Sequence, residues 1–116
     1  MKGNITKEYF YIGDYYGFTR EDTGIDPETG LQTYSYDYFY SRKIKMNLSI
    51  NLLGELIILS PEKMQLNGKI KNILDASKEE IYENGEWTIY QTAPLLGPLG
   101  LKEGYQYKAR LTAGDI

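Results

Sequence analysis

The sequence predicts an all-β protein, a small β-barrel or β-sandwich of about six to eight strands with an extended β-hairpin and little helix. The first indication is composition: 14% of the residues are aromatic and twelve are tyrosine, a residue that favours strands. The second is a series of short aromatic or β-branched runs separated by turns that contain glycine. Hydrophobic and charged fractions of 41% and 25% over 116 residues fit one folded domain spanning residues 1–116.

The first strand signal is EYFYIGDYYGFT, residues 8–19. Its two glycines, Gly13 and Gly17, predict either one kinked strand or two short strands. Residues 20–32, REDTGIDPETGLQ, follow. Because Pro27 and Gly30 are typical of turns, we expect this segment to be a long connecting loop.

The longest alternation in the chain covers residues 34–52. Odd positions are mostly Ser, Asp, Lys and Asn, and the even positions after Tyr34 include Tyr36, Tyr38, Tyr40, Ile44, Met46, Leu48, Ile50 and Leu52. Such alternation predicts a strand with one buried face, shared by the tyrosines and the aliphatic residues. A strand of this length would reach about 60 Å, which is too long for a small domain. We therefore expect it either to break near residues 41–43 or to project as half of a long hairpin over residues 33–59, with a turn at Gly54 and Glu55.

The remaining strands follow weaker signals. Residues 68–74, GKIKNIL, read as another strand, and residues 75–83 fit either a short helix or a strand. We favour the strand, because Asn84 and Gly85 followed by EWTIYQ are typical of a β-hairpin. The last predicted strand, GYQYKARLT, places on one face Tyr105, Tyr107, Ala109 and Leu111.

Several kinds of chemistry are disfavoured by the composition. The chain has neither cysteine nor histidine, which removes thiolate catalysis and the commonest general base and metal ligand. A formal charge of −3 gives no reason to expect nucleic-acid binding. We therefore expect no enzyme, no catalytic residues, no metal, no cofactor and no sequence-specific nucleic-acid partner. The first residues lack a secretory signal, and the apolar run at residues 56–59 is too short to cross a bilayer.

Three interpretations of Tyr34, Tyr36, Tyr38 and Tyr40 remain open at this point. The rings can cover the core of their own domain, they can contact another protein, or they can form a platform on which sugars stack. Tyrosine is enriched at the energetic hot spots of protein interfaces. Sugar binding would be better supported by clustered tryptophans, whereas the only tryptophan is Trp87.

Two further groups are predicted to lie in an interface. Arg42, Lys43 and Lys45 form a basic patch that can pair with the acidic loop at residues 20–28 of a neighbouring copy. The segment APLLGPLGL, residues 93–101, reads as a Pro/Gly loop with apolar side chains that require cover. Its predicted contact residues are Leu95, Leu96 and Leu99.

The order of these features resembles the small β-barrel proteins that join head to tail in tailed bacteriophages, the head-completion or stopper type. The resemblance lies in an early projecting hairpin, a Gly-Lys-Ile strand within residues 66–70 and a closing strand at residues 104–111. It implies a non-enzymatic assembly protein of the virion, made in the host cytoplasm. Its partners would be copies of itself, arranged in a ring, and other virion proteins, without a membrane. Two alternatives remain, a carbohydrate-binding module and a small phage-encoded inhibitor of a host protein.

Overall fold

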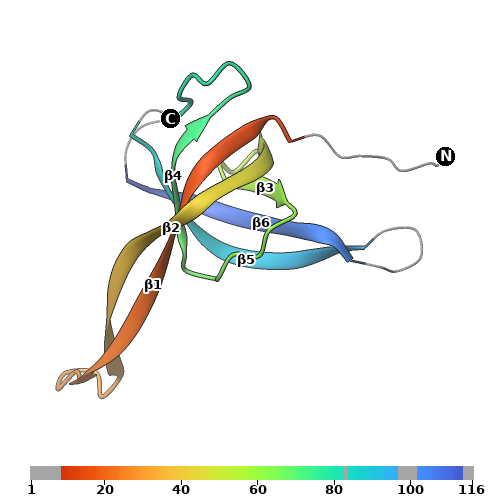
Figure 1. Cartoon of the computed structure of the whole chain (residues 1–116). Helices are drawn as coiled ribbons and strands as arrows, with labels where there is room; N and C mark the ends of the chain where they lie inside the picture. Colours follow the sequence, from red (N-terminus) through yellow and green to blue (C-terminus); the bar gives the residue numbers. More distant parts are fainter. Residues whose placement is uncertain (1–8, 83, 97–101, 114–116) are drawn as a thin grey trace.

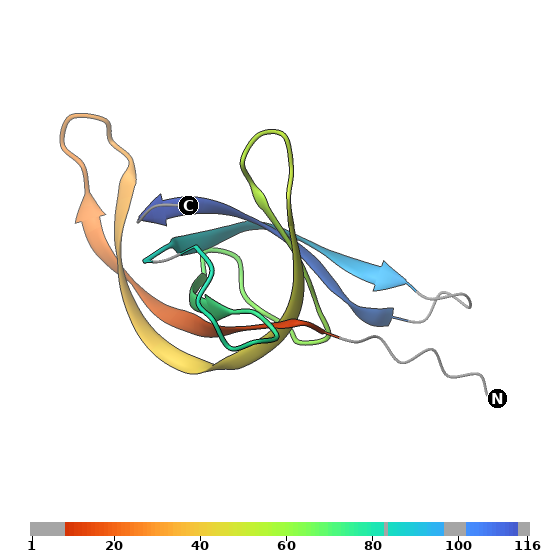
Figure 2. The ribbon, with the colours of Figure 1, turned by 90° about the horizontal axis from the view of Figure 1, so that it is seen from above.

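The computed structural model of the chain describes residues 9–82, 84–96 and 102–113. The described fold consists of six strands: β1 (Tyr11–Ile25), β2 (Gln32–Ile50), β3 (Leu56–Ser60), β4 (Lys69–Leu74), β5 (Glu86–Leu96) and β6 (Lys102–Ala113). All are antiparallel to their neighbours and close into a barrel in the order β1-β2-β3-β6-β5-β4 (Figures 1 and 2). No helix occurs among the described residues, so the predicted all-β class is confirmed.

The barrel closes because β1 pairs with β2 on one side and with β4 on the other. Its interior holds the hydrophobic core, to which all six strands contribute. Trp87 and Tyr107 are the largest fully buried side chains. Around them pack aliphatic residues that include Ile44, Met46, Leu56, Ile58, Ile70, Ile73 and Ile89. A helix of the length and apolarity that a bilayer crossing requires does not occur in the described part of the chain.

Two tyrosine hydroxyls fix the connection between β3 and β4, residues 61–68. β3 and β4 lie on opposite sides of the barrel, so this segment must cross between them. The Tyr107 hydroxyl donates to the Glu62 carbonyl and accepts from the Met64 N–H, both at 2.8 Å. The Tyr15 hydroxyl accepts from the Gln65 N–H at 2.9 Å. Burial raises the pKa of Tyr107 to about 12, because the phenolate is poorly solvated there.

A long two-stranded hairpin leaves the barrel on one side. β1 pairs with β4 only as far as Tyr16, opposite Lys69, and beyond this point β2 is its only partner among the described strands. We call residues 16–40 the projecting ribbon; it ends in a turn in which Gly30 N–H donates to the Asp26 carbonyl at 2.8 Å (Figure 1). The ribbon contributes to a longest molecular dimension of 62 Å.

The pairing of this hairpin differs from two of our expectations. Residues 20–25 continue β1 and are not a loop, since Arg20 pairs with Tyr36 and Ile25 with Gln32. Residues 20–25 are exposed on both faces of this hairpin, so they carry no alternation of apolar residues from which a strand can be predicted. The segment at 33–59 does turn at Gly54, but β2 and β3 pair only over residues 47–50 and 56–59. The long partner of β2 is β1.

Two further expectations were wrong. Residues 75–82 form turns with a single bridge between Leu74 and Glu80 instead of a strand. Asn84 and Gly85 therefore lie at the end of the longer connection between the paired strands β4 and β5 and do not form the expected tight hairpin turn. Residues 93–96, expected in a loop, continue β5 and pair with β6. Pro94 is tolerated there because β4 pairs only with residues 86–88 of β5, which leaves an open edge for a residue without an N–H.

Candidate interaction surface

A β-bulge at Ser41 decides which way the tyrosines of β2 face. Tyr15 of β1 pairs with Arg42, and the next residue, Tyr16, pairs with Tyr40, so Ser41 is the extra residue. One inserted residue moves the following side chains to the opposite face of the strand. Ile44 is fully buried in the barrel, whereas Tyr40 is 50% exposed. The predicted single stripe of tyrosines and aliphatic residues is therefore wrong: its two halves face opposite sides.

The tyrosines share the outer face of the ribbon with two aromatic residues of β1. We call this group the aromatic face: Tyr16, Phe18, Tyr34, Tyr36, Tyr38 and Tyr40. Tyr16 meets Tyr40 edge-on with ring centroids 5.8 Å apart, and Phe18 lies 5.4 Å from Tyr36 and 5.7 Å from Tyr38. Such cross-strand pairs stabilise a ribbon that lacks a third strand.

Cations from the barrel and from the ribbon itself cover parts of the aromatic face. Lys69 Nζ lies 4.2 Å from the centroid of the Tyr38 ring, and Lys71 Nζ lies 4.7 Å from that of Tyr16. Farther out, the Arg20 guanidinium lies 4.3 Å from the ring of Tyr34. These are cation–π contacts. Tyr38 is consequently half-buried, whereas Tyr34 and Tyr36 remain 42% and 40% exposed.

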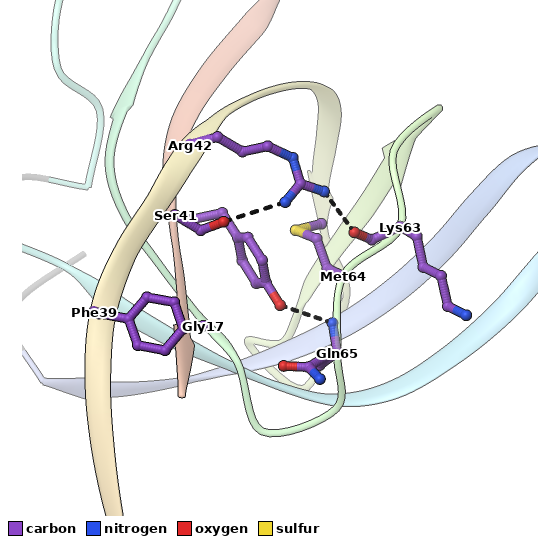
Figure 3. A pocket seen from close by; sticks show the side chains of 8 residues that line it. Gly17, Phe39, Ser41, Arg42, Lys63, Met64 and Gln65 are labelled. Atoms are coloured by element: carbon purple, nitrogen blue, oxygen red, sulfur yellow. Dashed lines mark hydrogen bonds between the residues drawn. The ribbon is translucent and has the colours of Figure 1, made fainter. Parts of the chain in front are cut away.

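The inner face of the ribbon forms a pocket where it joins the barrel, which we call the basal pocket. Its volume is about 330 Å³, and Phe39 stands at one side, directly beside its cross-strand partner Gly17 (Figure 3). A Cβ at Gly17 would lie 3.3 Å from the Phe39 ring, so the glycine leaves room for that ring. The pocket is lined by Tyr15, Gly17, Phe39, Ser41, Arg42, Lys63, Met64 and Gln65.

Arg42 spans this pocket and does not belong to an outward basic patch. Its Nη2 donates to the Lys63 carbonyl at 2.8 Å (Figure 3). Its Nε lies 3.5 Å from Glu62 Oε1. The guanidinium carbon lies 5.4 Å from the centroid of the Tyr15 ring. Arg42 therefore ties the base of the ribbon to the 61–68 connection.

Lys43 and Lys45, the other two residues of the predicted basic patch, lie on the outer side. Lys43 Nζ contacts Asp14 Oδ1 at 2.9 Å. Partial burial would raise the pKa of Asp14, but hydrogen bonds from Lys43 and Asn72 outweigh it and lower the pKa below its usual value. The Lys45 side chain is exposed, while its carbonyl accepts from Ser60 Oγ at 2.7 Å. Alternation thus separates Arg42 from both lysines.

The predicted leucine contacts lie elsewhere. Leu95 is half-buried and Leu96 is 65% exposed at the end of β5, which points away from the projecting ribbon in both views (Figures 1 and 2). Leu99 lies outside the described residues. The structure therefore brings the four tyrosines together but does not join them to Leu95 and Leu96 in one surface.

Comparison of the chain with protein-family models, curated proteins and solved structures found no match. The surface must therefore be interpreted from its own chemistry.

Sequence reasoning missed the residues of the barrel that hold the ribbon. The Tyr38 hydroxyl donates to the Asn67 carbonyl at 3.0 Å, and Lys69 and Lys71 cover two rings of the aromatic face. The alternation of Lys69, Ile70 and Lys71 is the signal that could have placed two lysines outward beside one inward isoleucine. Nothing in the sequence indicated which tyrosines they would meet.

Proposed function

We propose that this protein is a non-enzymatic assembly protein whose projecting ribbon binds neighbouring subunits, in the neck or tail of a phage particle. The observation that carries the proposal is the ribbon itself: two strands that extend beyond the barrel with exposed aromatic side chains on both faces. The phage setting comes from the resemblance in feature order and in the projecting hairpin.

An isolated two-stranded ribbon is at best marginally stable in water. This one also exposes Ile25 and Leu31 to 67% each, together with Phe39 to 51% and Tyr40 to 50%. Ordering such a surface costs conformational entropy and leaves apolar area in water. A partner that covers the ribbon would offset both costs, which favours a binding role over a purely internal one.

The ribbon also offers open strand edges. Beyond Tyr16, β1 has no neighbour except β2 among the described strands, and β2 meets β3 only from Asn47 onward. Unpaired edges can accept a strand from another chain. Exposed tyrosines beside such an edge provide side-chain contacts of the kind found at interface hot spots. Strand addition combined with aromatic packing is therefore the proposed binding mode.

Size-exclusion chromatography with light scattering, applied to the isolated protein and to particle preparations, tests this function. We expect either an oligomer or a monomer that is incorporated into particles. Tyr36→Ser combined with Phe39→Ser should reduce incorporation, whereas Thr92→Ser on exposed β5 should not. A stable monomer that is absent from particles would reject the proposal.

Carbohydrate binding is the second candidate, because the rings of Tyr36 and Tyr38 are inclined by only 26° with centroids 6.4 Å apart. Two such rings resemble a platform on which a sugar chain can stack. Phe18 and Lys69 already occupy part of the Tyr38 ring, however. A glycan array with the intact protein, Tyr36→Ala and Tyr38→Ala decides this question: absence of binding by the intact protein rejects carbohydrate recognition.

A further inference from the structure

The net negative charge of the chain is concentrated in the outer part of the ribbon. Residues 18–38 hold five carboxylates and one cation, Arg20, leaving eleven of the sixteen acidic and twelve of the thirteen basic residues for the rest of the chain. None of these five carboxylates forms an ion pair with another described residue. They are Glu21, Asp22, Asp26, Glu28 and Asp37. Four of them lie within residues 21–31, which we call the tip, and the tip is also apolar, because Ile25 and Leu31 are both 67% exposed.

The basal pocket has the complementary character. Phe39 and the buried Met64 provide an apolar wall and floor, and Arg42 and Lys63 provide cations. Lys63 is exposed and forms no ion pair within the described part of the chain. One acidic side chain, Glu62, lies nearby at 3.5 Å from Arg42. With two cations and this one carboxylate the pocket keeps a net positive charge, and Lys63 is the cation that has no acidic partner among the described residues.

The tip cannot reach the basal pocket of its own chain. Nine residues of β1, from Gly17 in the pocket to Ile25 at the far end of the ribbon, separate the pocket from the apolar residues of the tip. This corresponds to about 30 Å along a strand. The pairing of β1 with β2 holds the ribbon extended over this whole length. The matching surfaces of tip and pocket can therefore meet only between two copies.

We propose that the tip of the projecting ribbon of one copy docks in the basal pocket of a second copy. Ile25 and Leu31 would enter beside Phe39 and Met64, while tip carboxylates pair with Lys63 and Arg42. This inference rests on the proposed assembly function and specifies its contact. Tip and pocket are different surfaces, so the contact is heterologous and generates a closed ring or an open filament.

Charge reversal tests this contact. The pocket variant is Lys63→Glu with Arg42→Glu. The tip variant is Glu21→Lys with Asp22→Lys and Glu28→Lys, which changes the net charge of residues 18–38 from −4 to +2; Asp26 is retained because its carboxylate caps the turn by accepting from Glu28 N–H at 2.8 Å. Sedimentation velocity at low ionic strength should show self-association of each variant alone weakened by about tenfold or more, because like charges then meet. The single change Lys63→Glu leaves the hydrogen bonds of Arg42 intact, so the test remains valid if the double change unfolds the protein.

Mixing the two variants is the decisive step. The positive tip then meets a negative pocket, and the negative tip meets a positive pocket, so an equimolar mixture should recover the association of the wild-type protein. Reversals at exposed positions on the β4–β5 connection, Lys78→Glu and Glu79→Lys, serve as controls and should change nothing. Association that ignores the tip and pocket reversals, or that is absent in the wild-type protein at every concentration, would overturn this contact. Incorporation into particles is measured separately, and this measurement tests the proposed assembly function itself.

Discussion

The Tyr38 hydroxyl donates a hydrogen bond of 3.0 Å to the carbonyl oxygen of Asn67. This bond joins the projecting ribbon to the 61–68 connection of the barrel, and Lys69 covers the same ring at 4.2 Å. Asn67 adopts a left-handed backbone with φ of 71°, a conformation that asparagine tolerates better than most residues. Tyr38 therefore anchors the ribbon to the barrel through both a hydrogen bond and a cation–π contact.

Removing this hydroxyl should destabilise the protein modestly. For Tyr38→Phe we expect the free energy of unfolding to fall by about 1 kcal/mol, the usual net value of one hydrogen bond. Urea unfolding followed by tryptophan fluorescence measures this change. Tyr34→Phe is the matched control, because the ring of Tyr34 lies far out on the ribbon, and it should be close to neutral. Equal losses for both variants would argue against the anchoring role of Tyr38.

Deleting Ser41 should be far more damaging than replacing it. The deletion removes the bulge and forces either the tyrosines or Ile44 and Met46 onto the wrong face, and we expect a loss of about 3 kcal/mol or more from the displaced core. Ser41→Ala keeps the residue count and removes only the contact from Arg42 Nη1 to Ser41 Oγ at 3.3 Å. Thermal unfolding of the two variants tests this: similar melting temperatures would contradict the structural role of the bulge.

Gly68 is required because the ring of Tyr15 lies directly over it. A Cβ at this position would lie 2.8 Å from Tyr15 Cε1 and 3.0 Å from the Gln65 carbonyl oxygen. We expect Gly68→Ala to cost about 1–3 kcal/mol through overpacking. Gly17→Ala is the comparison, since its nearest neighbour is the exposed Phe39 ring at 3.3 Å, which can move. Chemical denaturation should rank Gly68→Ala as the less stable variant, and the reverse order would be evidence against this packing.

Alkaline pH should reveal the buried Tyr107. Burial raises its pKa from 10.0 in the unfolded chain to about 12 in the folded protein, so the folded state prefers the neutral phenol. Its contribution to stability is complete below pH 10 and is lost as the pH rises from about 10 to about 12. Unfolding free energies measured across this window should fall less steeply for Tyr107→Phe than for the wild-type protein or for Tyr36→Phe. Identical slopes would contradict the burial of this hydroxyl.

Local chemistry predicted the class of the fold but not the partners of its strands. The runs that became β4 and β6 are visible in the sequence because their inward residues alternate with polar ones, and β3 is visible as a short continuous apolar run. Ser41 is different: a bulge inserts one residue without disturbing the even spacing of Tyr40 and Ile44, so the sequence reads as one continuous face. The contact between Tyr38 and Asn67 joins residues that are 29 positions apart, and no local pattern encodes it.

The central claim is that the projecting ribbon mediates association, and shortening it tests this claim most directly. Replacing residues 20–36 by Asn-Gly joins Thr19 to Asp37, which already face each other, through a two-residue turn suited to a hairpin. Near-ultraviolet circular dichroism of Trp87, fully buried in the core, verifies that the barrel still folds. Light scattering then measures the mass of each protein, and the other particle components are added if the isolated wild-type protein is monomeric. We predict that the wild-type protein forms larger species and that the shortened protein stays monomeric. Equal masses for the two proteins in assembled species would contradict the claim.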